Sequence, residues 1–312
     1  MAERNILSGA FSNYDVIDEY FDFLRESKHS SNNTLQAYRR DLVRFIVYLD
    51  CLGVSVYDAD SEALSNFKGL LLKDSLSDSS ICRIMSSVRG LYKYLISNGA
   101  LDSNPSKVLK NTKVDKTPDL DILTNDEVDK LLAQPDVTEL KGLRDKAMLE
   151  VLYSTGLKVT ELISLDMTDV NLRLGYIHCR GTASSKSKND RMILLYPIAI
   201  KFLTQYIEKA RRVFVVSSDE GDSLFVNTSG NRMTRQGFWK VLKGYAEDAK
   251  INKNITPIAL RHSFAAHLIE NGADLNDIKE ILGHANLSST MVYENYLKNK
   301  ISSSYLKFHP RA

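Results

Sequence analysis

Four segments between Asn13 and Gly99 repeat apolar residues every three or four positions, the spacing of one face of an α-helix. They read YDVIDEYFDFLRE, TLQAYRRDLVRFIVYLDCLG, SEALSNFKGLLLKD and SSICRIMSSVRGLYKYLISNG. Gly53 and Gly99 stand where the second and fourth segments end, and serine and asparagine clusters precede those two segments. Four amphipathic helices can bury their apolar faces against one another, so we expect a small all-helical domain at the N-terminus.

The stretch that follows, LDSNPSKVLKNTKVDKTPDLDILT, is polar and contains Pro105 and Pro118, which is typical of a linker. A chain of 312 residues with 43% hydrophobic residues also exceeds the usual size of one domain. We therefore expect a helical domain over residues 12–100, a linker over 101–122, a second domain over 123–303 and a tail over 304–312.

The second domain begins with TNDEVDKLLAQP, where Thr124 and Glu127 have the spacing of a capping box. Helices are expected over LRDKAMLEVLYSTG, KVTELISLDMTDV, PIAIKFLTQYIEKARRVF and RQGFWKVLKGYAEDAKI, and in three pieces over 256–296. The runs LGYIHCRG and DRMILLYP flank TASSKSKN, which predicts a β-hairpin with a lysine-bearing tip. The expected fold is therefore mainly α, with a mixed α/β second domain that contains a small antiparallel β-hairpin.

Composition narrows the class of protein without identifying a partner. Lys and Arg number 41 against 39 Asp and Glu, a net charge of +2, so bulk charge does not indicate a nucleic-acid partner and any basic surface must be local. The sequence has no secretory leader and no apolar run long enough for a bilayer, so we expect a cytoplasmic protein. Cys51, Cys82 and Cys179 fit neither a disulfide framework nor a metal knuckle and are expected to be reduced and buried. We expect Trp239 in the core.

Several segments occur in an order and spacing that resemble the tyrosine recombinase (phage integrase) family, most closely its Xer-type members. They are NTLQAYRRDLVRFIVYL, LRDKAMLEVLYSTGLKVTELISL, LRHSFAAHLIENGADLNDIKEILGHANLSSTMVY and the closing HPRA. The resemblance implies a SAM-like core-binding domain and a catalytic domain that close around double-stranded DNA, with four subunits joining two duplexes. It leaves open whether the role is chromosome resolution and partition or integration of a mobile element.

The family chemistry accounts for the residue types. A tyrosine hydroxyl attacks a phosphodiester and forms a 3′-phosphotyrosyl link, so the bond energy is kept and the resemblance implies no metal, ATP or other cofactor. Arg and His donors stabilise the negative charge on the phosphate oxygens, and a lysine on the hairpin protonates the leaving oxygen. The pattern of the family is two arginines, two histidines, this lysine and the tyrosine.

Three positions of this chain match that pattern directly. Tyr293, nine residues after His284, matches the nucleophile; the structural alternative is a tyrosine packed on a neighbouring helix. Arg261 in LRHSF matches the second clamp arginine, whose planar fork suits two phosphate oxygens. His284 in LGH matches the second histidine; its alternative role is to cap a helix.

The hairpin lysine is assigned to Lys186 by aligning the DR of KNDRMILL with the family pattern, and Lys188 fits nearly as well. The alternative is that both are solvated turn residues, since lysines are common at loop tips.

Two positions depart from the pattern. Lys158 in TGLKVTEL stands where the family has its first clamp arginine, so charge is kept and the bidentate fork is lost. Ile258 stands where the family has its first histidine, and it donates no hydrogen bond. His262 and His267 are not replacements, because the family has histidines there as well. His178 and Arg180 on the first hairpin strand are alternative donors, although strand residues at this spacing are more often exposed.

Basic residues on two N-terminal helices are the candidate DNA contacts: Arg39, Arg40, Arg44, Arg83, Arg89 and Lys93. Such residues bind phosphates without reading sequence, and the alternative for each one is a solvated helix face.

Two functions follow from these matches and departures. The first is a site-specific recombinase or integrase with Tyr293, Arg261, His284, Lys186 and a weaker Lys158 around the phosphate. The alternative is a degenerate relative that binds DNA without cutting it. A helix-based transcription factor is disfavoured, because the tyrosine and the hairpin would have no role.

Apolar residues at helical spacing after Tyr293 also predict a C-terminal helix. In the family this helix packs into the neighbouring subunit; the alternative is that it folds onto its own domain.

Overall fold

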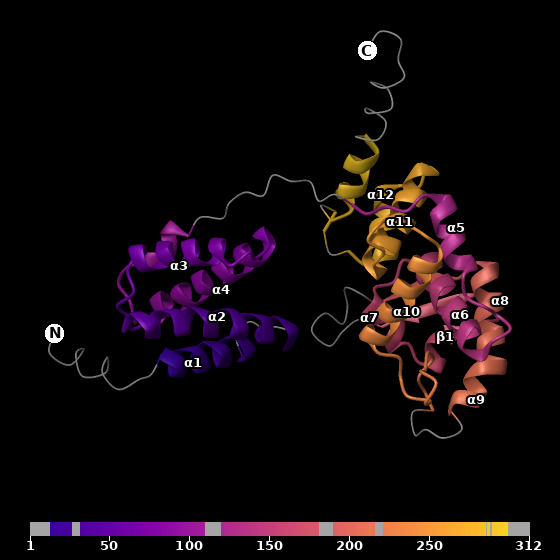
Figure 1. The fold of residues 1–312 in the computed structure, drawn as a ribbon, viewed down its shortest axis with the longest axis horizontal. Helices are drawn as coiled ribbons and strands as arrows, with labels where there is room; N and C mark the ends of the chain where they lie inside the picture. The colour runs from indigo at the N-terminus through magenta and orange to yellow at the C-terminus, as the bar shows by residue number, and fades with distance from the viewer. Residues whose placement is uncertain are drawn as a thin grey trace, which may run out of the picture. The chain divides into compact units, whose positions relative to one another are not determined.

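The computed structural model describes residues 13–26, 32–109, 120–180, 190–215, 221–284, 286–287 and 289–298. The chain divides into two compact units, Met1–Lys116 and Thr117–Ala312 (Figure 1). Within the described residues, no helix is long and apolar enough to cross a membrane.

The described part of the first unit is helical, as the periodicity predicted. Its elements are α1 (Asn13–Glu26), α2 (Asn32–Leu52), α3 (Ser61–Lys73), α4 (Asp78–Ser97) and the short 3₁₀ helix η1 (Pro105–Val108). The Asp60 side chain caps α3 by accepting the Ala63 N–H at 2.8 Å, and Ser77 caps α4 by accepting the Ser80 N–H at 3.3 Å. These caps satisfy backbone donors that the helices leave free.

The core of the first unit lies where the apolar stripes of these helices meet. The Phe45 ring of α2 lies 5.0 Å from Phe67 of α3 and 6.2 Å from Tyr92 of α4, measured between centroids. All three rings are fully buried, and burying rings of this size is the main stabilising contribution available to a small helical bundle.

The second unit contains the following elements: α5 (Asn125–Ala133), α6 (Leu140–Thr155), α7 (Val159–Ser164), the 3₁₀ helix η2 (Met167–Asp169), β1 (Val170–Asn171), β2 (Tyr176–Cys179), β3 (Arg191–Leu194), α8 (Pro197–Gln205), the π-helical turn η3 (Tyr206–Arg211), α9 (Arg212–Phe214), α10 (Arg235–Asp248), α11 (Pro257–Glu270) and α12 (Leu275–Leu282). Residues 289–298 are also helical. The predicted capping box starts α5: Thr124 Oγ1 accepts the Glu127 N–H, and Glu127 Oε2 accepts the Thr124 N–H at 2.7 Å.

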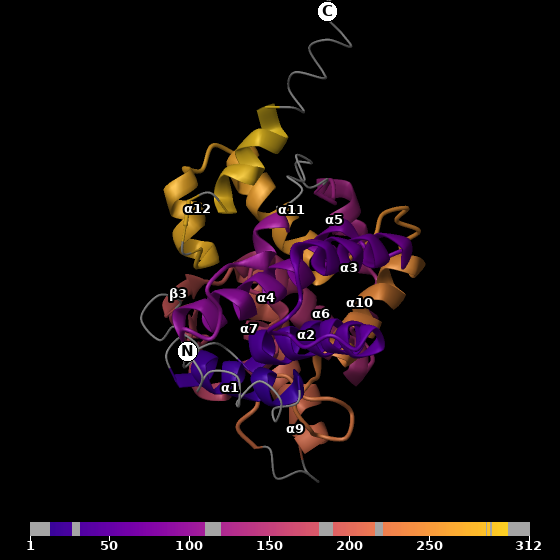
Figure 2. The same ribbon diagram turned by 90° about the vertical axis from the view of Figure 1, so that its left-hand side faces the viewer.

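Helix α6 runs through the centre of this unit and is buried on almost every side. At its end, Gly156 adopts a left-handed conformation with φ of 61°, and a Cβ there would lie 2.4 Å from the Phe264 ring. Only glycine fits this turn, which leads directly into Lys158 and α7. Helices α11 and α12 and the helix of residues 289–298 gather at the end of the unit opposite α9 (Figures 1 and 2).

The predicted hairpin is present as β2 and β3, antiparallel, with Cys179 opposite Arg191 and Tyr176 opposite Leu194. The sequence did not predict β1, which pairs with β2 and makes a three-stranded sheet in the order β1-β2-β3. The helix predicted over KVTELISLDMTDV is too long, because α7 ends at Ser164. Beyond Ser164, the Met167 N–H donates to the Asp222 carbonyl, and the Leu224 N–H donates to the Leu165 carbonyl. These hydrogen bonds take the place of the ones a longer helix would make.

Two predictions about burial are wrong. Trp239 is 47% exposed, because the buried stripe of α10 runs through Phe238, Leu242 and Ala246, and the tryptophan lies one position off that stripe. Cys51 is exposed near the end of α2 and Cys82 is half-buried, whereas Cys179 is buried as expected.

Candidate active site

Arg261 lies on the first half of α11, which Thr256 caps by accepting the Ala259 N–H at 3.0 Å. Its side chain is buried, and its two terminal nitrogens donate to the carbonyl oxygens of Gly156 at 2.6 Å and Leu282 at 2.7 Å. Burial lowers the pKa of this guanidinium and the nearby Glu161 raises it; an arginine in a protein stays charged. Arg261 therefore places a positive charge between the turn that ends α6 and the turn that ends α12.

His284 follows the α12 turn at Gly283, a glycine with φ of 63°. Its Nδ1 lies 3.0 Å from the Thr290 hydroxyl oxygen, and that threonine is fully buried. Burial, followed by the positive charges of Arg261, Lys158, Arg191 and His262, lowers the pKa of His284 to about 4. The ring is therefore neutral at physiological pH, and Nδ1 is oriented by Thr290.

Tyr293 lies in the helix of residues 289–298 with 3% of its surface exposed. It belongs to a buried cluster with Phe264, Ile278 and Leu282, and its ring lies edge-on to His262 with centroids 5.6 Å apart. Burial raises the pKa of the phenol, whereas the charge of Arg261 lowers it. The hydroxyl is protonated in the DNA-free protein, and Arg261 is close enough to influence it.

Lys158 precedes α7, and Glu161 caps that helix by accepting the Lys158 backbone N–H at 2.8 Å. The Lys158 ammonium lies 3.9 Å from Glu161 Oε1, and its side chain is 48% exposed. Arg261 also lies 3.9 Å from Glu161, and Arg191 lies 3.0 Å from it. Hydrogen bonds and ion pairing with Arg191 lower the pKa of this carboxyl against the raising effect of burial, so Glu161 is ionised.

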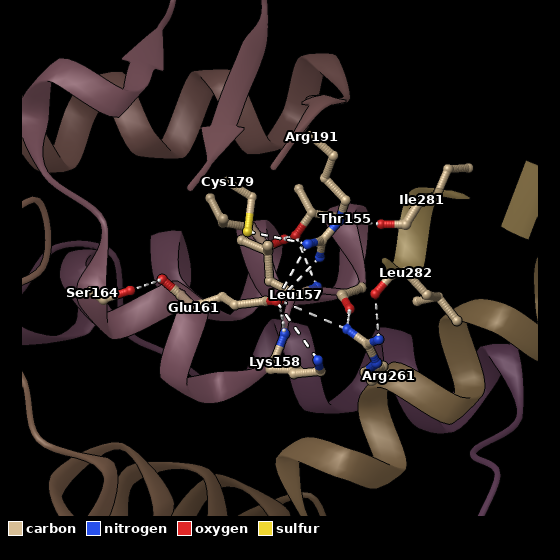
Figure 3. A network of polar contacts seen from close by, with 12 residues as sticks. Thr155, Leu157, Lys158, Glu161, Ser164, Cys179, Arg191, Arg261, Ile281 and Leu282 are labelled. Carbon is tan, nitrogen blue, oxygen red and sulfur yellow. Dashed lines mark hydrogen bonds and ion pairs between the residues drawn. The ribbon is translucent and has the colours of Figure 1, made fainter. Parts of the chain in front are cut away.

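Figure 3 shows Lys158, Arg191 and Arg261 converging on Glu161 from three directions (Figure 3). Three positive charges against one negative charge leave a net charge of +2 in this cluster. Besides burial, the charge of Arg261 affects the pKa of both His284 and Tyr293, so these two residues lie near the same arginine. The structure thus brings together four of the predicted site residues: Lys158, Arg261, His284 and Tyr293. The sequence analysis assigned no role in the site to Glu161, Arg191, His262 or Thr290.

Ile258 is 63% exposed in the first turn of α11, so an apolar side chain stands where the family has a histidine. His267 does not replace it: its Nδ1 is bound to the Tyr153 hydroxyl at 2.8 Å and its Nε2 to the Leu123 carbonyl at 2.9 Å. Both ring nitrogens of His267 therefore hold α11 to neighbouring segments. His262 differs, because its ring lies against Tyr293.

Neither alternative donor on β2 or next to it belongs to this cluster. His178 pairs with Asp190 across the base of the hairpin, and Arg180 binds Asp169 at 2.5 Å and Asp166 at 3.6 Å. The hairpin lysines, Lys186 and Lys188, lie outside the described residues.

Most of the predicted DNA contacts in the first unit already have partners within it. Arg39 pairs with Asp18 at 2.9 Å and Arg44 with Asp74 at 2.5 Å, and all four side chains are well exposed. Surface pairs of this kind are weak and exchange readily for phosphates.

Of the remaining four residues, two make contacts within the unit and two are exposed, with no ion pair to another described residue. Arg83 pairs with the buried Asp41, and Arg89 donates to the Leu109 carbonyl at 3.1 Å, so both help to hold the unit together. Arg40 and Lys93 are exposed.

No group of three or more His, Cys, Asp or Glu side chains is arranged to hold a metal ion within the part of the chain that the structure describes.

The two family comparisons agree with the two units: residues 17–99 match the phage integrase N-terminal SAM-like domain, and residues 121–300 match the phage integrase family.

Relatives named tyrosine recombinase XerD cover almost the whole chain. The protein from Oceanobacillus iheyensis is 42% identical over 300 residues, 95% of this chain and 99% of the relative. The protein from Staphylococcus epidermidis is 40% identical over 298 residues, again 95% and 99%.

Solved structures share the fold. XerH bound to a palindromic difH substrate superimposes with a TM-score of 0.75 at 22% identity, over 96% of this chain and 86% of that one. The Tn1549 transposon integrase in complex with circular intermediate DNA gives 0.70 at 19% identity, over 89% and 94%.

The chain therefore belongs to the phage integrase family. Within that family it is a Xer-type tyrosine recombinase, an enzyme of site-specific DNA recombination. The comparisons lend no support to the alternative of a relative that binds DNA without cutting it.

Proposed function

We propose that Tyr293 carries out the cutting step at a DNA phosphodiester held between Lys158, Arg261 and His284. The tyrosine oxygen forms a bond to phosphorus while the bond to the 5′-oxygen breaks, which leaves a 3′-phosphotyrosyl link and a free 5′-hydroxyl. The tyrosine loses its proton, and the leaving 5′-oxygen gains one from a general acid, for which Lys186 is the candidate and Lys188 the alternative. Attack of another 5′-hydroxyl on the link rejoins the strand.

The observation that carries this proposal is the excess of positive charge around Glu161. The cluster of Lys158, Arg191, Arg261 and Glu161 has a net charge of +2 and lies beside the buried Tyr293. A phosphodiester carries one negative charge, and a five-coordinate transition state carries about two, so a site of this charge favours the transition state. Donors that are already held in place by the protein add no cost of reorganisation.

His284 contributes a neutral hydrogen-bond donor rather than a charge. With Thr290 donating its hydroxyl proton to Nδ1, the proton of the ring is on Nε2, from which it can bind a phosphate oxygen. Ionisation of Tyr293 accompanies DNA binding in this proposal, because burial keeps the phenol protonated in the free protein.

DNA recognition and assembly follow from the family. The helical domain over residues 12–100 and the catalytic domain over 123–303 bind double-stranded DNA, with Arg39, Arg40, Arg44, Arg83, Arg89 and Lys93 as the phosphate contacts of the first domain. Four copies, or a mixture with a related recombinase, join two sites through exchange of their C-terminal segments. The substrate is cytoplasmic chromosomal or mobile-element DNA.

The test uses a duplex selected for binding from a random-sequence library and nicked beside each candidate scissile phosphate. A nick allows the cut strand fragment to diffuse away, which traps the covalent complex. The wild-type chain and Tyr296→Phe should form an adduct that resists SDS, and Tyr293→Phe should not. If the wild-type chain binds the duplexes and none of them yields an adduct, this proposal fails.

A further inference from the structure

Arg191 is the first residue of β3 and the arginine of the DR pair that aligned the hairpin. Its side chain is 10% exposed and packs between three elements. Its Nε donates to the Ile281 carbonyl of α12 at 2.7 Å. Its Nη2 donates to Glu161 Oε2 at 3.0 Å, and its Nη1 to Glu161 Oε1 and to Cys179 Sγ, each at 3.3 Å (Figure 3). The guanidinium thus joins the sheet, α7 and the end of α12.

Arg191 and Lys158 compete for the one carboxylate of this cluster, while Arg261 lies 3.9 Å from it and is held by two backbone carbonyls. The planar fork of Arg191 engages both oxygens of Glu161, whereas the Lys158 ammonium lies 3.9 Å from one oxygen, at the limit of an ion pair. Two charge-assisted hydrogen bonds with fork geometry outcompete a single distant contact with a strongly hydrated ammonium. The Glu161 carboxylate therefore pairs mainly with Arg191, and the half-exposed Lys158 ammonium can bind an anion.

We propose that Arg191 is a positioning residue of the recombinase: by engaging the Glu161 carboxylate, it keeps that carboxylate from pairing with Lys158 and so leaves the Lys158 ammonium to the DNA phosphate. This inference rests on the proposed function above. It also gives a physical reason why a lysine can serve at the first clamp position. A lysine has no fork with which to bind a carboxylate and a phosphate at once, so a second cation must bind the carboxylate.

The Arg191 guanidinium also holds the end of α12, the segment that leads to His284. Arg191 binds the Ile281 carbonyl and Arg261 binds the next one, that of Leu282, so two arginines hold consecutive carbonyl groups at the end of α12. A Cβ on Gly283 would lie 2.8 Å from Arg191 Nη1, which shows how closely the turn before His284 packs on the guanidinium. These carbonyls carry the negative end of the helix dipole, which positive side chains stabilise.

The test measures the single-turnover rate of adduct formation on the nicked duplex for Arg191→Gln, Glu161→Gln and the double variant. Arg191→Gln should bind DNA within about twofold of wild type, since phosphate contacts of other residues dominate affinity, and cleave about 10- to 100-fold more slowly. In that variant Glu161 is free to pair with Lys158. Adding Glu161→Gln removes the competing charge, while the amide oxygen still caps the Lys158 backbone N–H, so the double variant should recover about 10-fold.

A double variant no faster than Arg191→Gln would overturn the proposal, because the carboxylate that competes for Lys158 would then have been neutralised without benefit. If Arg191→Gln does not fold, as judged by its thermal unfolding, Arg191→Lys replaces it. Lysine keeps the charge but leaves one Glu161 oxygen free, so it should also cleave slowly and should also be rescued by Glu161→Gln. An unrescued defect in that pair overturns the proposal equally.

A duplex with sulfur in place of the 5′-bridging oxygen separates this role from one exerted through the hairpin lysine. A thiolate leaves without protonation, so a defect in the general acid disappears on this substrate. The Arg191→Gln defect should persist, because it concerns the non-bridging oxygens. Full recovery on the sulfur substrate would assign Arg191 to the general acid and contradict the proposal. Absence of an adduct with the wild-type chain would instead count against the proposed function.

Discussion

The Nδ1 atom of His284 lies 3.0 Å from the hydroxyl oxygen of the fully buried Thr290. This hydrogen bond connects the turn that follows α12 to the helix that carries Tyr293, so the proposed phosphate donor and the proposed nucleophile are linked within nine residues of sequence. In the proposed function it also decides which nitrogen of His284 faces the phosphate.

Thr290→Val should therefore slow adduct formation. Valine has nearly the same shape and removes the hydroxyl, at a cost of about 1 kcal/mol and hence about 5- to 10-fold in rate if the bond orients the ring. Thr290→Ser, which keeps the hydroxyl, is the matched control and should stay close to wild type. Equal rates for valine and serine would show that His284 is oriented by other contacts.

The pKa of His284 gives a prediction about stability and pH. Its folded value of about 4 lies below the value of about 6.5 in an unfolded chain, so the unfolded state binds more protons between these values. The free energy of unfolding should consequently fall as pH drops from about 6.5 towards 4.

Chemical denaturation of wild type and His284→Gln across that range isolates the contribution of this residue. The difference in unfolding free energy, wild type minus variant, should decrease as the pH is lowered. A difference that stays constant from pH 7 to 4.5 would mean that His284 does not titrate with a depressed pKa.

Lys158 is expected to be a working phosphate donor. Lys158→Ala should reduce the single-turnover rate by about 10²- to 10³-fold, the effect of losing one donor to a developing negative charge. DNA affinity, measured in parallel, should change much less, because many other phosphate contacts remain. A rate unchanged by the alanine variant would exclude Lys158 from the site.

Restoring both family residues, Lys158→Arg with Ile258→His, tests whether the altered site limits the enzyme. Ile258 is exposed on the first turn of α11, so a histidine fits there without repacking the core. We expect the double variant to cleave faster than a wild type that already cleaves measurably. Cleavage by the double variant alone, with none by wild type, would instead identify this chain as a degenerate recombinase.

The tail beyond Lys300 lies outside the described residues, and its role is predicted from the family. Deleting residues 301–312 should leave binding to a single site nearly intact and abolish the joining of two duplexes, because in the proposed assembly the exchanged segment closes the ring of subunits. Gel-shift and synapsis assays on one preparation measure both effects. Equal loss of both would place the segment in the core of its own subunit.

The sequence predicted those features whose cause is local. The Thr124 capping box, the helices of the first unit and the hairpin strands depend on residues close together in the chain, and all are present. Trp239 was misplaced because helical periodicity fixes the spacing of a buried stripe but fixes its position only to within about one residue.

The site was predicted only as far as its motifs extend. Tyr293, Arg261 and His284 stand in motifs of the family. Arg191 instead acts through Glu161, 30 residues away, and Ile281, 90 residues away. Contacts at such separations leave no local signature. One indirect signal was present in the strand itself: Arg191 lies two residues before the buried Ile193, so the alternation of β3 places a charged residue on the same inward face.

The central claim is that Tyr293 becomes covalently attached to DNA, and peptide mapping of the trapped adduct tests it most directly. After protease and nuclease digestion, tandem mass spectrometry should find the nucleotide mass on the peptide that contains Tyr293, and the released DNA end should be a 5′-hydroxyl. Attachment to another residue, such as Tyr296, or a released 3′-hydroxyl with a 5′-phosphotyrosyl link, would contradict the account.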